Sequence, residues 1–207
     1  MNHSQQRVFL LSPARCDGRR AEILLNPSAS FDLAQRLRGL EGAPLGEVFS
    51  FLSGLYFRGK LAYARAYGRR SRKQPSVFVI TTDRGLMLPE AHVRRDDLVA
   101  FSAVDIAGGD ERYLAPLRLD AERLAGEISR TSLVVLLGSI ATGKYSDTLT
   151  QVFGERLVFP TDFVGRGDMS RGGLMLRCVA EQRELTYQPV LGAVRHGQRP
   201  PKLERRR

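Results

Sequence analysis

A run of five apolar residues, Leu-Val-Val-Leu-Leu at positions 133–137, constrains the fold of this chain more than any other feature. A continuous Leu/Val run of this length, flanked by Ser132 and Gly138, is typical of a strand covered on both faces by helices. It is far shorter than the roughly 20 apolar residues that a membrane helix needs. Further strands are predicted at residues 7–12, 77–80, 156–159 and 174–179, and helical periodicity is present at residues 31–40, 46–67, 117–128 and 144–153. Strands that alternate with helices predict an α/β fold, a single domain with a mixed sheet flanked by helices.

Charge and composition indicate where such a domain works. The 207 residues contain 32 Lys and Arg against 22 Asp and Glu, a formal net charge of +10. Half of this excess lies at the C-terminus, so we expect one domain over residues 1–192 and a basic, disordered tail over residues 193–207. The polar N-terminus has no signal-peptide core, and two cysteines cannot form a disulfide scaffold, which favours a cytoplasmic protein without a membrane partner. The positive balance favours a polyanionic partner, nucleic acid above all.

A second cluster of positive charge lies within the predicted helix at residues 46–67 and just beyond it. No acidic residue occurs between Gly54 and Thr82, and aromatic residues interleave with the cations. Such a stretch predicts phosphate contacts with bases stacked on aromatic rings. The alternative is a helix whose aromatic side chains are buried and whose cationic face is solvated. The cations are Arg58, Lys60, Arg65, Arg69, Arg70, Arg72 and Lys73, and the aromatic residues are Tyr56, Phe57, Tyr63 and Tyr67.

The segment after the central strand, Gly138-Ser-Ile-Ala-Thr-Gly143-Lys144, has the spacing of a phosphate-binding P-loop. The next position, which should be Ser or Thr to hold magnesium, is Tyr145. Too little chain follows for the usual succession of strands, so a nucleoside triphosphatase is not favoured. A phosphate could still bind to helix N-terminal amides and to Lys144.

Three other turns contain side chains that could serve a site. The glycine-rich segment 165–173 contains Arg166, Asp168 and Arg171, which could clamp a phosphate or form only an internal ion pair. Asp83 and Arg84 follow a predicted strand and mark either a site at the sheet edge or an ordinary turn. Arg15 follows the first strand, and the adjacent cysteine has no nearby histidine and is a weak nucleophile candidate. The three histidines show no ligand spacing, so neither a metal nor a cofactor is expected.

Several of these segments, in this order, resemble the YaaA family of bacterial peroxide-stress proteins and its short uncharacterised bacterial relatives. The opening Phe-Leu-Leu-Ser-Pro-Ala-Arg at residues 9–15 is similar to that family's strand and Leu-Ser-Pro-Ala-Lys turn. Residues 48–56, 80–89, 137–145 and 171–177 follow the family's later segments in outline. The resemblance implies a cytoplasmic α/β protein that binds DNA in a basic cleft and limits oxidative damage. It also implies that Lys144 and Tyr145 belong to a family turn and not to a degraded P-loop.

Two functions are compatible with these observations. The first is DNA binding of the oxidative-stress type, mainly through phosphate contacts, which would be salt-sensitive and would discriminate little among sequences. The second is an enzyme acting on a nucleobase, nucleoside or nucleic acid by glycosidic-bond chemistry, with Asp83 or Asp168 as acid or base. That alternative requires the turns at residues 12–17, 83–85, 139–145 and 166–171 to converge on one pocket. An interaction protein whose charge serves solubility is a third possibility. The predicted phosphate contacts are Arg15, Arg58, Lys60, Arg65, Arg69, Arg70, Arg84, Lys144, Arg166 and Arg171.

Overall fold

A six-stranded mixed sheet forms the centre of the protein, which we describe from a computed structural model covering residues 5–70, 74–201 and 203. Its strand order is β4-β3-β1-β6-β7-β8. The four inner strands are parallel, and both edge strands are antiparallel to their neighbours. The inner strands are β1 (Arg7–Leu11), β3 (Val77–Ile80), β6 (Leu133–Leu137) and β7 (Leu157–Pro160), and the edges are β4 (Leu86–Met87) and β8 (Tyr187–Pro189). The predicted α/β class with a mixed sheet is confirmed.

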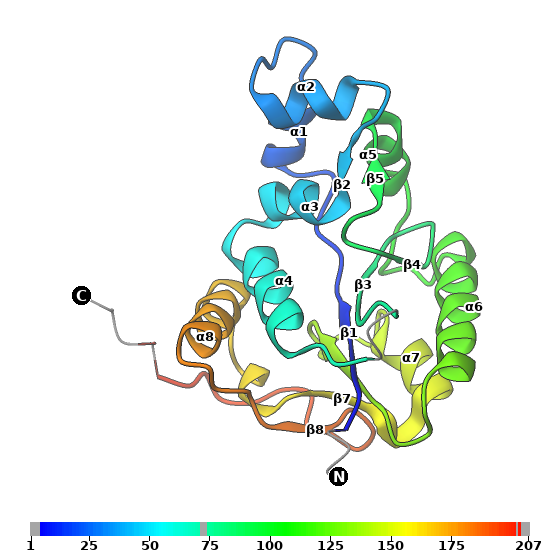
Figure 1. Ribbon diagram of the computed structural model, residues 1–207, viewed down its shortest axis with the longest axis vertical. Coiled ribbons are helices and arrows are strands. Elements are labelled where there is room, and N and C mark those ends of the chain that lie inside the picture. Colours follow the sequence, from blue (N-terminus) through cyan, green and yellow to red (C-terminus); the bar gives the residue numbers. More distant parts are fainter. Residues whose placement is uncertain (1–4, 71–73, 202, 204–207) are drawn as a thin grey trace.

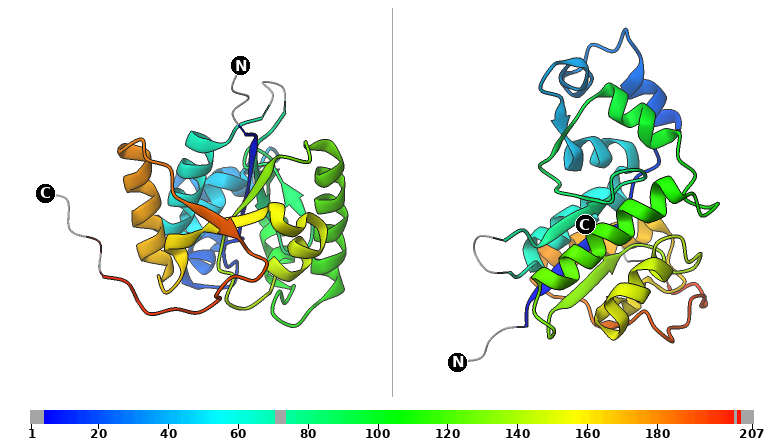
Figure 2. Two further views of the ribbon diagram at one scale, coloured as in Figure 1. Left: turned by 90° about the horizontal axis from the view of Figure 1, so that it is seen from below. Right: turned by 90° about the vertical axis from the view of Figure 1, so that its right-hand side faces the viewer.

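Helices cover both faces of this sheet, as Figures 1 and 2 show. Helices α4 (Leu55–Tyr67) and α8 (Asp168–Ala180) pack together on one face. Helices α6 (Glu111–Glu127) and α7 (Ser146–Phe153) pack together on the other. The two central strands are therefore buried on both sides, and residues 8–11 and 134–137 have no exposed surface. This double burial explains why β1 and β6 are continuous apolar runs without alternation.

A smaller layer lies beyond the carboxyl ends of the parallel strands, in the upper part of Figure 1. It contains a two-stranded antiparallel sheet and four helices, two of them inserted between β1 and α3. These elements are α1 (Arg19–Leu25), α2 (Asp32–Arg38), β2 (Ala43–Pro44), α3 (Leu45–Ser53), β5 (His92–Val93) and α5 (Arg95–Ser102). Short 3-10 turns, η1 (Gly154–Arg156) and η2 (Thr161–Phe163), flank β7. In the described part of the chain, no helix combines the length and apolarity needed to cross a membrane.

One local expectation from the sequence is corrected by the structure. Residues 174–179 are not a strand, because they form the second half of α8 and bury Leu174, Met175 and Cys178 at helical spacing. The predicted helix at residues 46–67 is broken once, at Gly54, where φ is +57°. Gly54 and Gly59 both weaken a helix, but Gly59 is an interior residue of α4. Helices α1 and α5 and the short strands β2, β4, β5 and β8 are additions to the predicted elements.

The C-terminal segment follows the surface of the domain and contains no helix or strand in its described part, residues 193–201 and 203. Arg195 donates a hydrogen bond to Asp147 at 2.7 Å, and the side chain of Leu203 packs against the core. The carbonyl oxygen of Pro201 accepts a hydrogen bond from Arg166. Thus this segment contacts both α7 and the start of α8. Of the other cations of the predicted tail, Arg199 is exposed, and Lys202 and residues 205–207 lie outside the described residues.

Candidate functional site

The main cavity lies at the carboxyl ends of β1 and β6. The chain leaves β1 to form β3 on one side and later returns to form β6 on the other side. Loops after two such strands diverge, and this divergence opens a crevice at the point where the strand order reverses. A cavity of about 610 Å³ occupies this position and is within the range of small-molecule sites.

Three of the four turns predicted to converge do meet in this cavity. The turn after β1 contributes residues 12–15, the loop after β6 contributes Ser139, Thr142, Lys144 and Tyr145, and the start of α8 contributes residues 166–168 and Arg171. The fourth turn, with Asp83 and Arg84, does not line the cavity in the described structure. Arg84 instead donates to Asp97 at 2.5 Å and stacks over the ring of Phe101. This turn therefore has a structural role, and the prediction of a site there is not supported by the cavity geometry.

Positive charge dominates the cavity wall. The cations are Arg15, Lys144, Arg166 and Arg171, and the single carboxylate on the described wall is Asp168. Arg171 is held deep in the wall, with 11% of its side chain exposed, and donates to the carbonyl of Phe163 and to Asp168. The excess of cations over carboxylates favours an anionic ligand, because partial burial weakens solvent screening of these charges.

Beneath this wall lies Lys60, an α4 residue without exposed surface. Its Nζ donates one hydrogen bond to the carbonyl oxygen of Ser12 at 2.6 Å and another to the Ser12 hydroxyl oxygen at 2.9 Å. The same Nζ lies 4.4 Å from the centroid of the Tyr56 ring and 4.8 Å from that of Phe57. Burial lowers the pKa of Lys60 to about 7, with Arg171 also lowering it and Asp168 opposing them.

The P-loop-like segment has a different internal structure from a phosphate cradle. The ring of Tyr145 folds back into the loop, and its hydroxyl accepts a hydrogen bond from the backbone amide of Ser139 at 2.8 Å. A P-loop needs such amides free for phosphate oxygens. Gly138 is required here, since a Cβ at this position would lie 2.7 Å from the Tyr145 hydroxyl and 2.9 Å from the Cβ of Ser12. The Tyr145 hydroxyl thus occupies a backbone amide that a P-loop would offer to phosphate. Lys144 lines the main cavity.

Tyr56 contributes a second buried hydroxyl to the cavity wall. This hydroxyl has no well-oriented hydrogen bond in the described structure and lies close to the guanidinium of Arg171. Desolvation raises the pKa of Tyr56, so the hydroxyl stays protonated at neutral pH. An uncommitted hydroxyl beside a cation is suited to donate to an anionic ligand.

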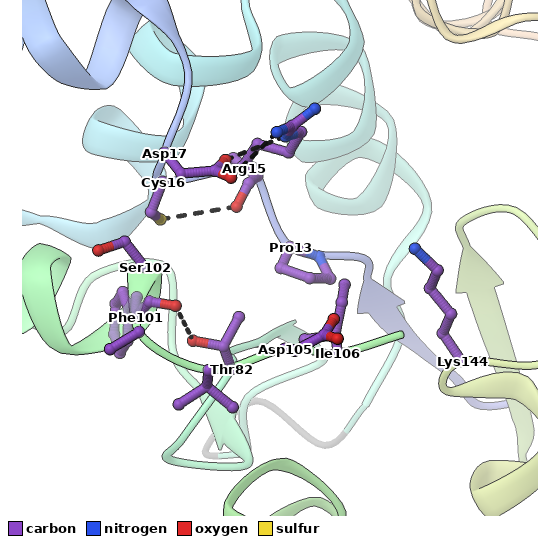
Figure 3. Close-up of a pocket in the computed structure, with 13 residues that line it drawn as sticks. Pro13, Arg15, Cys16, Asp17, Thr82, Phe101, Ser102, Asp105, Ile106 and Lys144 are labelled. Atoms are coloured by element: carbon purple, nitrogen blue, oxygen red, sulfur yellow. Dashed lines mark hydrogen bonds and ion pairs between the residues drawn. The ribbon is translucent and has the colours of Figure 1, made fainter. Parts of the chain in front are cut away.

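A second cavity of about 480 Å³ adjoins the first and shares Arg15 and Lys144 with it (Figure 3). Cys16 lies on its wall and donates to the carbonyl of Ala14, while Thr82 donates to the carbonyl of Phe101. Burial raises the pKa of the Cys16 thiol to about 12, which makes it a poor nucleophile in the folded protein. In the described residues, no group of three or more His, Cys, Asp or Glu side chains could hold a metal ion.

The cationic stretch of α4 does not form the predicted stacking surface. Its four aromatic residues, Tyr56, Phe57, Tyr63 and Tyr67, are all buried in the core. The helix turns them toward the sheet and α8, because they fall on its inward stripe together with Lys60. The alternative of a helix with buried aromatic side chains is therefore the one the structure supports.

The cations of the same stretch are dispersed. Arg65 pairs with Glu90 at 2.8 Å, and the nearly buried Arg70 lies 3.6 Å from Glu127. Arg58 and Arg69 are exposed, but neither lines the main cavity. Arg72 and Lys73 lie outside the described residues. The predicted contacts that the structure brings together are thus Arg15, Lys144, Arg166 and Arg171, with Lys60 directly behind them.

Ser12, Tyr56 and Tyr145 join the candidate site although the sequence does not mark them as phosphate contacts. The spacing of Tyr56, Lys60, Tyr63 and Tyr67 is the available signal, since it places a lysine on an otherwise aromatic helix face. Comparison with protein-family models, with curated proteins and with solved structures found no match to this chain. The resemblance to the YaaA family stays a hypothesis, and the candidate site is defined by its own geometry.

Proposed function

We propose that this chain binds nucleic acid or a nucleotide through phosphate contacts in the main cavity, with DNA as the first ligand to test. The observation that carries the proposal is the convergence of four cations from three separate turns on one cavity at the switch point of the sheet. Such a crevice is the usual ligand position in open α/β sheets. The net charge of +10 adds long-range attraction for a polyanion.

Each part of the cavity has a distinct role in this proposal. Arg15 and Lys144 lie at the accessible side of the cavity and can meet phosphate oxygens without breaking core contacts, although a phosphate at Arg15 competes with its ion pair to Asp17 at 3.0 Å. Arg171 is held by the carbonyl of Phe163 and supplies a fixed charge deeper in the wall. Recognition through phosphates predicts little base specificity. A role in oxidative-stress protection is the part of this proposal that rests on the YaaA resemblance alone.

Binding of a fluorescent oligonucleotide, in single-stranded and duplex form, tests the proposal directly. The Lys144→Ala variant should lose about tenfold in affinity or more, because a charged hydrogen bond contributes about 1.5–3 kcal/mol. For duplex DNA, each phosphate contact should contribute about −0.9 to the slope of the logarithm of the binding constant against the logarithm of the salt concentration. Loss of one phosphate contact in Lys144→Ala should therefore make this slope shallower by about 0.9.

The matched control is Arg118→Ala, which removes an exposed cation of α6 that lines neither cavity. It should bind like the wild type if the cavity is the site. Equal losses in Lys144→Ala and Arg118→Ala would show that net charge alone drives binding and would refute a cavity site. A mononucleotide competitor should displace the oligonucleotide only if the cavity is the binding site.

Chemistry on a nucleoside is the second candidate function, favoured by the presence of Asp168 as the single described carboxylate on the cavity wall. Asp168 is two-thirds exposed and lies 3.4 Å from Arg171. Asp83, the other proposed acid or base, does not line the cavity. The Asp168→Asn variant should abolish turnover of a nucleoside or nucleotide while binding is retained. Unchanged turnover in this variant would remove Asp168 from the chemistry.

A further inference from the structure

Phosphate binding does not explain the contact between Lys60 and Ser12. Lys60 is fully buried, so it cannot act as a surface cation for a polyanion. Its two hydrogen-bond partners are both on Ser12, the first residue after β1. Ser12 is nearly buried and lines the main cavity. Lys60 donates to the Ser12 hydroxyl oxygen across 2.9 Å, and once the amine is neutral the same distance allows it to accept the serine proton, which is the geometry of a nucleophile and its base.

Burial of Lys60 favours the neutral amine that a base requires, whereas the faces of the two adjacent aromatic rings favour the protonated form. Its neighbours are the Tyr56 and Phe57 rings, and the charged groups that act on it are Asp168 and Arg171, both on α8. No carboxylate is hydrogen-bonded to Nζ among the described contacts. Desolvation is the strongest influence and brings the pKa of Lys60 to about 7, which is suitable for proton transfer near neutral pH.

The backbone fixes this pair in place through an unusually close helix crossing. A Cβ on Gly59 would lie 2.6 Å from the carbonyl oxygen of Gly172, and a Cβ on Gly172 would lie 2.6 Å from the carbonyl oxygen of Leu55. Helices α4 and α8 therefore meet backbone to backbone at the residues next to Lys60 and Arg171. This contact brings the amine and the guanidinium to the same cavity from two different helices, on rigid elements and not on loops.

The hydroxyl of Tyr145 also contacts Ser12. The Tyr145 hydroxyl is hydrogen-bonded to Ser12 and also accepts from the Ser139 amide. Tyr145 is itself buried, so its position is set by packing. Ser12 is thus held between the amine on α4 and the phenol of the loop after β6. The four cations of the wall line the same cavity as Ser12 and would stabilise negative charge that develops on an attacked group.

We propose that Ser12 is a nucleophile, that Lys60 is its general base, and that the substrate is a phosphate ester held by the cations of the main cavity. In the first step the Ser12 Oγ forms a bond to phosphorus, and the bond from phosphorus to the departing alcohol oxygen breaks with its electron pair. The Ser12 proton passes to Lys60, and the departing oxygen takes a proton from water. Lys60 then returns its proton to the solvent, which neutralises the hydroxide so formed.

Water releases the phosphoryl group in the second step. Its oxygen bonds to phosphorus, the bond from phosphorus to Ser12 breaks, and one water proton restores the serine hydroxyl. No oxidant, reductant or metal enters either step. The choice of a phosphate ester rests on the proposed phosphate-binding function, whereas the choice of nucleophile rests on the Lys60 and Ser12 geometry alone. The two can therefore fail separately.

A fluorophosphonate probe tests the nucleophile, since attack forms the bond from Ser12 to phosphorus and releases fluoride. Mass spectrometry of the full-length chain should show one adduct, mapped to the peptide containing Ser12. The rate of labelling should rise with pH around a midpoint near 7, because only neutral Lys60 accepts the proton. The Ser12→Ala variant should lose the adduct. The Lys60→Met variant, which keeps the volume of the side chain, should label at least about 100-fold more slowly.

Ser53 supplies the matched control, as a serine that lines the same cavity outside the Lys60 contact. The Ser53→Ala variant should label like the wild type. If Lys60→Met does not fold, the pH profile of the wild type and the Ser12→Ala variant still decide the question. The assignment of Ser12 as the nucleophile would be overturned if no adduct formed, or if adducts formed on several serines without dependence on Lys60.

Turnover of bis(p-nitrophenyl) phosphate then tests the substrate class. Release of nitrophenolate that is lost in Ser12→Ala supports a phosphate ester. Ser12-dependent release from p-nitrophenyl acetate without release from the phosphate diester would overturn that class and leave an acyl substrate. Retained oligonucleotide binding without any labelling of Ser12 would refute the nucleophile and leave the proposed binding function intact.

Discussion

The Lys60→Met substitution gives the sharpest test of the physical reasoning, because it removes a buried titratable amine without changing the side-chain volume much. The folded protein holds the pKa of Lys60 near 7, whereas its ordinary value is 10.5. Between these two values the unfolded chain binds a proton that the folded protein does not bind. The contribution of Lys60 to the free energy of unfolding therefore rises with pH across this window and is lost as the pH falls from 10.5 toward 7.

The size of the effect follows from the pKa difference. One pKa unit corresponds to about 1.4 kcal/mol. At pH 7 Lys60 is half protonated in the folded protein, and by pH 9 it is almost fully neutral. Integration over this interval gives the wild type about 2 kcal/mol of stability that Lys60→Met cannot gain. The cysteines and tyrosines, whose pKa values burial raises, are common to both proteins, so the difference between the two curves isolates Lys60.

Urea unfolding at pH 6, 7, 8 and 9, followed by circular dichroism, measures this difference. The gap between wild type and Lys60→Met should change by about 2 kcal/mol in favour of the wild type between pH 7 and 9. The same substitution at Lys144, a half-buried lysine of the cavity wall, is the control for loss of a lysine. Parallel curves for wild type and Lys60→Met would mean that Lys60 does not titrate in this range, and would refute both its desolvation and its role as a base.

Three further outcomes test other parts of the structure. Gly59→Ala should lower the free energy of unfolding by about 1–3 kcal/mol in chemical denaturation, because the new Cβ would meet the backbone of α8. Gly126→Ala is the control: this glycine of α6 faces open space, and the substitution should be neutral or stabilising by about 0.5 kcal/mol. Iodoacetamide should leave Cys16 unmodified at pH 8 until the protein unfolds, and rapid alkylation of the native protein would contradict its burial. Tyr145→Phe should cost about 1–2 kcal/mol in thermal unfolding through the unpaired Ser139 amide, and an unchanged melting temperature would show that water replaces the phenol.

The central strands and the switch-point loops could be predicted from the sequence because their signals are local. Burial of β1 and β6 on both faces requires continuous apolar runs, and the turns that follow contain small residues and cations. The sequence predicts a strand at residues 174–179, in the second half of α8, and the preceding Gly172 and Gly173 disfavour an isolated helix. The stability of α8 comes from packing against Gly59 of α4, a contact between residues far apart in the chain.

The candidate site was only partly predictable for a related reason. Arg15, Lys144, Arg166 and Arg171 can each be named from a turn, but their convergence depends on the strand order. The charge of Lys60 suggests an exposed phosphate contact. Its position on the aromatic stripe of α4 instead buries Lys60 completely. Only the packing of α4 against the sheet shows that the Lys60 amine contacts the hydroxyl of Ser12.

The C-terminal segment limits how the chain can be shortened without disturbing the cavity. Beyond β8, the carbonyl of Pro201 accepts a hydrogen bond from Arg166 on the cavity wall. Arg195 donates to Asp147 at the start of α7. Ending the chain at about residue 190, to remove positive charge, would also remove these two supports. A truncation or a purification tag placed there changes the ligand site as well as the net charge. Charge-reversal substitutions within the full-length chain are therefore the cleaner way to separate the two effects.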